Sequence, residues 1–426
     1  MKESLAENQP HYTLRTVIDT VQQCNLRCKY CHPGNTWTNL HLPANLIEDS
    51  FDVIEKRGIL EVVLTGGEIT LHPELTRIIE ATQILDKSVA TLITNGTILT
   101  PELVKQLSRS NIARICTSID GPTEETHNFG RGKTFDKAMN GLRMLSETGK
   151  PITVISVAHH QNYKNIIELS YLLAREGLAS QHHICAPSYS GEAKKNYEQF
   201  RLRKDEYFAL QSVIDDSFDD LNDQGLFVTF NSFWPATGER AKTNNSRVLT
   251  LQQLAEQLKN SYIILRPNGD VRLTAASWGR ETIGNAVVGN LYKDGAQKSF
   301  ELAEETYSKG WVSQLPREVE ALHKFQYGLD ANTVTTDHVI YNNQETKYMV
   351  QMIPIKPLSQ SDLFKIELTE AEILQIASSI NKNPVRYRMI NFGNDSYILY
   401  DRTASRIVLL KPGEFNVINK LISKNV

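Results

Sequence analysis

The fold is decided by residues 60–96, LEVVLTGGEITLHPELTRIIEATQILDKSVATLITNG. A β-branched run at 60–65 precedes a segment of helical period at 73–85, and a second β-branched run follows at 89–94. Strand, helix and strand in this order predict a βαβ unit with parallel strands. The loop at 66–68 follows the first strand, and ligands bind at such strand ends.

The same alternation extends from residue 13 to about residue 187. Expected strands are 13–19, 60–65, 89–94, 112–119, 152–158 and 181–184, and expected helices are 43–56, 73–85, 101–108, 135–148 and 165–176. Pro43, Pro73 and Pro101 suit the first turn of three of these helices. After a tail at 1–12, we therefore expect an α/β fold over 13–235, an open partial (β/α)6 TIM-like barrel.

The alternation stops beyond residue 188. Residues 194–218 have a helical period, and strands are expected near 226–230 and 262–265. The turn signal Pro267-Asn268-Gly269-Asp270 predicts a small hairpin module within 236–350. A polar, proline-containing stretch at 351–362 precedes a last segment that we expect to form helix, two strands and helix. Residues 360–426 are thus predicted to be a small α+β domain.

Composition excludes several classes of function. The chain has 426 residues, 40% apolar, with 46 basic against 49 acidic residues, so no overall field favours nucleic acid. Its apolar runs are too short for a membrane span, and the N-terminus lacks the apolar core of a secretion signal. We therefore expect a cytoplasmic protein with neither nucleic acid nor membrane as partner.

Three of the five cysteines fall within eight residues. Cys24, Cys28 and Cys31 stand in CNLRCKYC, directly after the first expected strand. Three thiolates on one loop can hold three irons of a 4Fe–4S cluster and leave the fourth iron open to an external ligand. Zinc is the alternative, but it usually takes paired C-x2-C units or added histidines, and His32 is poorly placed to complete the same tetrahedron.

This cysteine motif resembles that of the radical S-adenosylmethionine (radical SAM) superfamily, and further matches follow over about residues 12–190. The resemblance implies one 4Fe–4S cluster and bound S-adenosylmethionine. It places Tyr30 beside the adenine, although a packed loop tyrosine is an equal alternative. It also implies that Gly66, Gly67 and Glu68 bind the amino group of S-adenosylmethionine.

Residues at the ends of the later expected strands also resemble the family. By similarity, Ser118 and Asp120 would lie near the ribose and methionine part of the cofactor, and Asn95 would support the same pocket. The segment HNFGRGKTF resembles the H-x-x-x-R-G segment of the SPASM-type subgroup. Arg131 is therefore expected to pair with the methionine carboxylate through two hydrogen bonds, whereas His127 is expected to be structural.

The resemblance implies a radical mechanism. An external donor such as flavodoxin or ferredoxin reduces the cluster, and S-adenosylmethionine is cleaved to methionine and a 5′-deoxyadenosyl radical that abstracts a substrate hydrogen. Residues 266–291 resemble the start of a SPASM or twitch domain, yet no cysteine follows Cys185, so we expect no auxiliary cluster. Reactions without net oxidation, such as epimerisation, are thereby favoured.

Cys185, at the end of the sixth expected strand, is a candidate hydrogen donor, and a buried strand cysteine is the alternative. His159–His160 and His182–His183 also stand at strand ends. Adjacent residues of a strand point to opposite faces, so at most one histidine of each pair is expected to line the cavity.

The leading hypothesis is an enzyme, an isomerase or oxidoreductase, that modifies a ribosomally made peptide. Residues 383–422 faintly resemble PqqD-like domains, which could bind a peptide by adding it as a strand, although a structural cap is equally plausible. The second hypothesis is a radical epimerase or dehydrogenase of a small metabolite such as an aminoglycoside or nucleoside sugar. The third is a noncatalytic iron–sulfur or zinc-binding protein.

Overall fold

The structure is a computed structural model. It describes residues 15–31, 34, 38–187, 191–231, 248–250, 263–273, 287–308, 368–382, 387–393, 396–401 and 406–423. Contacts divide the chain into two units, residues 1–233 with 260–352, and residues 234–259 with 353–426. Within the described residues, no helix is long and apolar enough to cross a membrane.

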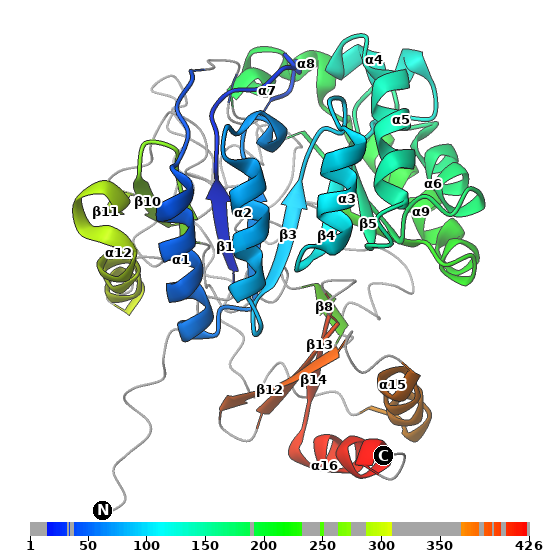
Figure 1. The fold of residues 1–426 in the computed structure, drawn as a ribbon. Coiled ribbons are helices and arrows are strands. Elements are labelled where there is room, and N and C mark those ends of the chain that lie inside the picture. The colour runs from blue at the N-terminus through cyan, green and yellow to red at the C-terminus, as the bar shows by residue number, and fades with distance from the viewer. Residues whose placement is uncertain are drawn as a thin grey trace, which may run out of the picture. The chain divides into compact units, whose positions relative to one another are not determined.

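The first unit is built on a parallel sheet whose strands follow one another in chain order (Figure 1). The sheet is not closed, so the predicted open α/β barrel is confirmed. A seventh strand pairs in parallel with the sixth and extends the sheet beyond the six strands expected. The seven strands are β1 (Arg15–Asp19), β2 (Glu61–Thr65), β3 (Val89–Ile93), β4 (Ile112–Ser118), β5 (Ile152–Val157), β6 (Gln181–Cys185) and β7 (Phe227–Asn231).

Helices connect the strands, and the apolar side chains of both form the core. All five residues of β2 are buried, as expected of a strand that is covered on both faces. Pro101 lies in the first turn of its helix as predicted, whereas Pro43 and Pro73 precede theirs, because the helices begin at Ala44 and Leu75. The connecting helices are α1 (Ala44–Arg57), α2 (Leu75–Ala81), α3 (Pro101–Arg109), α5 (Phe135–Ser146) and α6 (Ile166–Arg175).

One helix near the strand ends was not predicted. Helix α4 (Glu124–Arg131) begins at a capping box in which Thr123 and Thr126 satisfy each other's backbone amides. The region predicted as one helix from residue 194 forms α7 (Gly191–Lys195), α8 (Tyr197–Phe200) and α9 (Lys204–Asp223).

The turn predicted at 267–270 joins β9 (Ile263–Leu265) to β10 (Asp270–Leu273), and β11 (Val287–Asn290) pairs with β10. These strands do not stand apart, because β9 pairs in parallel with β1 and the sheet becomes ten-stranded. An ion pair of 2.9 Å between Arg266 Nη1 and Asp19 Oδ2 reinforces this junction. Helix α12 (Leu291–Ser308) follows.

The second unit holds a four-stranded antiparallel sheet in the order β12 (Tyr387–Gly393), β13 (Ser396–Asp401), β14 (Arg406–Leu410) and β8 (Val248–Thr250). Helices α15 (Glu370–Lys382) and α16 (Pro412–Ser423) flank the three C-terminal strands in sequence. The prediction of only two strands here was wrong. Leu410 of β14 packs in one buried cluster with Leu399 of β13, Ile380 and Ile418, so the third strand completes the core.

Candidate active site

The three clustered cysteines lie on one loop after β1, and each is partly buried. Two neighbouring elements hold this loop by backbone hydrogen bonds. Lys29 N donates to Gly130 O of α4 at 2.9 Å, and Glu192 N of α7 donates to Cys31 O at 2.9 Å. Helices far apart in sequence thus fix the shape of the cysteine loop.

The donor set of this loop suits an iron–sulfur cluster better than a single zinc ion. A structural zinc ion usually takes four protein ligands, one more than the three thiolates of this loop. A cubane accepts each thiolate on a different iron. Burial raises the pKa of Cys24 to about 11 and that of Cys31 to about 12, so iron would displace thiol protons on binding. His32, the residue considered for zinc, lies outside the described residues.

Gly66 and Gly67 pack directly against the segment that leads into the cysteine loop. Gly67 N donates to Val21 O at 2.7 Å, and Glu68 N donates to Gln23 O at 2.8 Å. A Cβ atom on Gly67 would lie 2.4 Å from Gln23 O, closer than any side chain tolerates. The glycines therefore permit a backbone-to-backbone contact that positions the loop.

Glu68 joins the ends of β2 and β3. Its buried carboxylate accepts hydrogen bonds from Thr94 Oγ1 at 2.5 Å, from Asn95 N at 2.7 Å and from Thr70 Oγ1 at 2.7 Å. Burial raises the pKa of Glu68, and these hydrogen bonds oppose the rise. Asn95 Nδ2 lies 4.0 Å from Cys24 Sγ, so the Glu68 group borders the cysteine loop.

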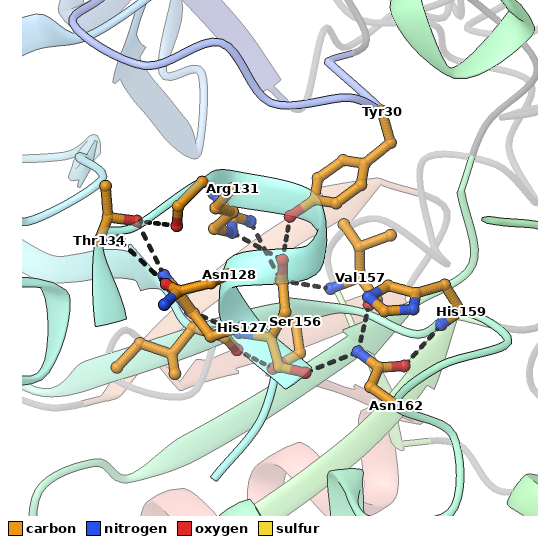
Figure 2. Close-up of polar contacts among 12 residues, drawn as sticks. Tyr30, His127, Asn128, Arg131, Thr134, Ser156, Val157, His159 and Asn162 are labelled. Carbon is orange, nitrogen blue, oxygen red and sulfur yellow. Dashed lines mark hydrogen bonds and ion pairs between the residues drawn. The ribbon is translucent and has the colours of Figure 1, made fainter. Parts of the chain in front are cut away.

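A second polar group is centred on Asp120, just beyond β4, and Figure 2 labels its neighbours Tyr30, Arg131 and Val157. Its fully buried carboxylate accepts hydrogen bonds from Arg131 Nε at 2.8 Å, from Arg131 Nη2 at 3.2 Å and from Val157 N at 3.0 Å. The hydroxyl of Tyr30, between the second and third cysteines, also donates to it. Burial alone would raise the pKa of Asp120, but Arg131 and these donors hold it below its usual value.

The structure thus brings most of the predicted site residues into two groups beside the cysteine loop. One contains Glu68 and Asn95, and the other contains Tyr30, Asp120 and Arg131. Ser118 ends β4, two residues before Asp120, and is partly buried.

Cys185 ends β6 and is partly buried. Its thiol donates to Ser156 O at 3.4 Å. Burial raises the pKa of this thiol to about 12, with a further rise from the Asp120 carboxylate and a decrease from Arg131. The thiol is therefore protonated at neutral pH and lies within electrostatic range of the Asp120 group.

The histidine pair in β6 behaves as the alternation of a strand predicts. His182 is fully buried, with Nε2 2.7 Å from Ser156 Oγ and Nδ1 2.7 Å from Ser170 Oγ. His183 points to the other face and lies 2.8 Å from Thr229 Oγ1. His127 is also fully buried, where it accepts the Asp120 N–H at 3.3 Å, as a structural histidine would.

Asn162 is a central residue that the sequence reasoning missed. Its buried amide donates to Asp120 O at 2.6 Å and to Val157 O at 2.8 Å, and its Oδ1 accepts the His159 N–H at 2.7 Å. It thereby joins the chain after β4 to the chain after β5 (Figure 2). The rule applied to the other strand ends, polar residues just after a strand, could have identified it.

Comparison with known proteins defines the class. Residues 18–172 match the family model described as "Radical SAM superfamily". The chain therefore contains a radical SAM superfamily domain, and this domain holds both polar groups and the cysteine loop.

Individual relatives are similar over this part of the chain. The AdoMet-dependent heme synthase of Methanosarcina barkeri is 30% identical over 168 residues, which cover 38% of this chain and 47% of that protein. The mycofactocin maturase MftC of Mycolicibacterium smegmatis is 29% identical over 171 residues, covering 39% and 43%. The alignments thus span less than half the length of these curated relatives.

Solved structures show the same fold at low sequence identity. SuiB of Streptococcus suis bound to S-adenosylmethionine superposes with a TM-score of 0.57 and 18% identity, covering 73% of this chain and 70% of that chain. Native anSMEcpe with bound AdoMet superposes with a TM-score of 0.51 and 17% identity, covering 69% and 82%.

Proposed function

We propose that the chain is a radical SAM enzyme that binds one 4Fe–4S cluster through Cys24, Cys28 and Cys31. The superfamily match carries this proposal, because the matched domain contains the three thiols beside two buried polar groups. With both cofactors bound, the reduced cluster would cleave S-adenosylmethionine and supply a 5′-deoxyadenosyl radical that abstracts a substrate hydrogen. An external donor such as flavodoxin or ferredoxin would provide the electron, in the cytoplasm.

We assign the binding of S-adenosylmethionine to the two polar groups. Glu68, supported by Gly66, Gly67 and Asn95, would hold the amino group. Nε and Nη2 of Arg131 donate hydrogen bonds to Asp120. We therefore assign the third nitrogen, Nη1, to the methionine carboxylate.

In this proposal Asp120 positions other side chains, whereas Ser118 contacts the cofactor. Asp120 already accepts four hydrogen bonds and has no exposed surface. It would therefore position Tyr30 and Arg131, leaving contact with the ribose to Ser118 and the adenine to Tyr30.

For the substrate we propose a ribosomally made peptide. The neighbouring structure titled SuiB bound to precursor peptide SuiA and the maturase MftC are both proteins whose names refer to peptide binding or maturation. If the second unit binds a peptide by strand addition, β12 is the edge that we assign to it, because it is seven residues long, whereas β8 at the other edge of the described sheet has only three. Action on a small metabolite remains the second candidate, and the protonated Cys185 suits radical epimerisation in either case.

Epimerisation requires that the hydrogen atom on the substrate carbon is removed and then replaced by a different one. The substrate C–H hydrogen goes to 5′-deoxyadenosine, and the Cys185 thiol then returns a hydrogen to the substrate carbon. The thiyl radical left behind takes one electron from the external donor and a proton from solvent.

The test incubates the reconstituted protein with a precursor peptide encoded beside its gene, in D2O, followed by mass spectrometry. A mass increase of about one unit per modified residue supports peptide epimerisation. A peptide that stays unmodified while a sugar metabolite is converted would favour the second candidate.

A further inference from the structure

His159 is a buried hydrogen-bond donor that belongs to neither of the two polar groups. Its side chain has no exposed surface. Nδ1 accepts the Gln161 N–H at 3.2 Å, so the ring proton resides on Nε2. Burial lowers the pKa of His159 to about 4, which keeps the ring neutral.

Nε2 has no hydrogen-bond partner among the described residues. A buried donor without a partner costs about 1–3 kcal/mol of folding stability. Such a donor therefore indicates a position where a bound ligand supplies the acceptor.

Aromatic rings surround this imidazole. The centroid of His159 lies 5.3 Å from that of Phe129, 5.3 Å from that of Phe200 and 6.4 Å from that of Tyr30. Tyr30 belongs to the cysteine loop, and Phe129 belongs to α4, the helix that ends at Arg131. A single hydrogen-bond donor among aromatic faces suits a flat ring that carries an acceptor in its own plane.

We propose that His159 Nε2–H donates a hydrogen bond to a ring nitrogen of the adenine of S-adenosylmethionine. The inference rests on the proposed function and adds a base-recognition residue to it. Adenine is the one aromatic part of this cofactor, and its ring nitrogens N1, N3 and N7 are acceptors. The amino and carboxylate groups are charged and suit the Glu68 and Arg131 positions instead.

The backbone around His159 supports this role. Asn162 Oδ1 accepts the His159 N–H, and the same amide donates to Asp120 O (Figure 2). The imidazole is therefore fixed by the residue that also fixes the Asp120 group. The neighbouring His160 pairs with Glu206 of α9 instead, which makes it a matched control.

The experiment measures binding of S-adenosylmethionine and its 1-deaza, 3-deaza and 7-deaza analogues to the anaerobically reconstituted protein by equilibrium dialysis. The variants are His159→Phe, which keeps a flat ring but loses the donor, His159→Gln, which restores a donor, and His160→Gln. We expect one analogue to bind the wild type roughly three- to tenfold more weakly than the parent compound. That penalty should vanish in His159→Phe and persist in the other two variants.

Equal deaza penalties in the wild type, His159→Phe and His159→Gln would overturn the inference, because the histidine would then contribute packing alone. If His159→Phe fails to fold, the wild type alone still tests the inference. Binding of all three deaza analogues to the wild type as tightly as S-adenosylmethionine itself would overturn it. A reconstituted wild type that binds no S-adenosylmethionine would instead contradict the proposed function itself.

Discussion

Arg131 and Asp120 form a buried ion pair with two hydrogen bonds, Nε to Oδ2 at 2.8 Å and Nη2 to Oδ1 at 3.2 Å. The side chain of Arg131 is 10% exposed and that of Asp120 is not exposed at all. The pair joins α4 to the end of β4, and Tyr30 attaches the cysteine loop to the same carboxylate.

Removing one partner of this pair should destabilise the domain strongly. Arg131→Met leaves the Asp120 carboxylate buried without its counter-ion, and we expect a loss of about 3 kcal/mol or more in the free energy of unfolding. The double variant Asp120→Asn/Arg131→Met should lose less than the sum of the two single variants. Urea unfolding of all four proteins provides the measurement, and strictly additive losses would show that the two residues are not coupled.

Gly67→Ala should disturb the cysteine loop. The new Cβ would lie 2.4 Å from Gln23 O and 2.6 Å from Gln22 O, both backbone atoms that cannot rotate away. We expect a destabilisation of about 1–3 kcal/mol together with reduced iron content after reconstitution. Gly413→Ala, where a Cβ meets nothing within 4 Å, is the matched control and should keep full iron loading. Normal iron loading in Gly67→Ala would refute the assigned packing role.

His182 should make stability depend on pH. Burial lowers its pKa to about 3 in the folded protein, against about 6.5 in the unfolded chain. Below pH 6.5 the unfolded chain binds a proton that the folded protein excludes, so the contribution is complete above pH 6.5 and decreases as the pH falls towards 3. At pH 5.5 the loss of stability from this histidine amounts to about 1.4 kcal/mol. Other buried histidines such as His159 lose stability in the same way, so urea unfolding at pH 7.5 and 5.5 should show a loss about 1.4 kcal/mol larger in the wild type than in His182→Asn. An identical loss in both proteins would contradict the assignment.

Cys185→Ala should separate hydrogen abstraction from hydrogen return. The side chain contacts Ser156 rather than the cysteine loop, so iron content and 5′-deoxyadenosine formation should stay within about twofold of the wild type. Deuterium incorporation into an epimerised product should fall at least tenfold. Undiminished incorporation in the variant would exclude this thiol as the donor.

The sequence predicted the parallel sheet because its signal is local. Runs such as Val62–Leu64 are apolar and rich in β-branched residues, and the apolar residues of the segments between them recur at a helical period. Helix α4 escaped prediction because it is short and polar, and its start depends on the side-chain bonds of Thr123 and Thr126. The pairing of β8 with β14 joins segments more than 150 residues apart, which no local pattern records.

The sequence predicted which residues form the candidate site, but it did not predict the contacts between them. Polar residues at strand ends identified Glu68, Asn95 and Asp120, since the carboxyl ends of parallel strands meet at one edge. The ion pair of Asp120 with Arg131 and the bridging amide of Asn162 depend on how β4, α4 and the chain after β5 meet in space.

The measurement that tests the central claim most directly is 5′-deoxyadenosine formation. The protein is reconstituted anaerobically with iron and sulfide and incubated with dithionite and S-adenosylmethionine, beside a Cys24→Ala/Cys28→Ala/Cys31→Ala variant. The control is Cys116→Ala, which changes a buried cysteine within β4. We predict 5′-deoxyadenosine from the wild type and from Cys116→Ala, and none from the triple variant. A colourless wild type that binds zinc and forms no 5′-deoxyadenosine would contradict the account.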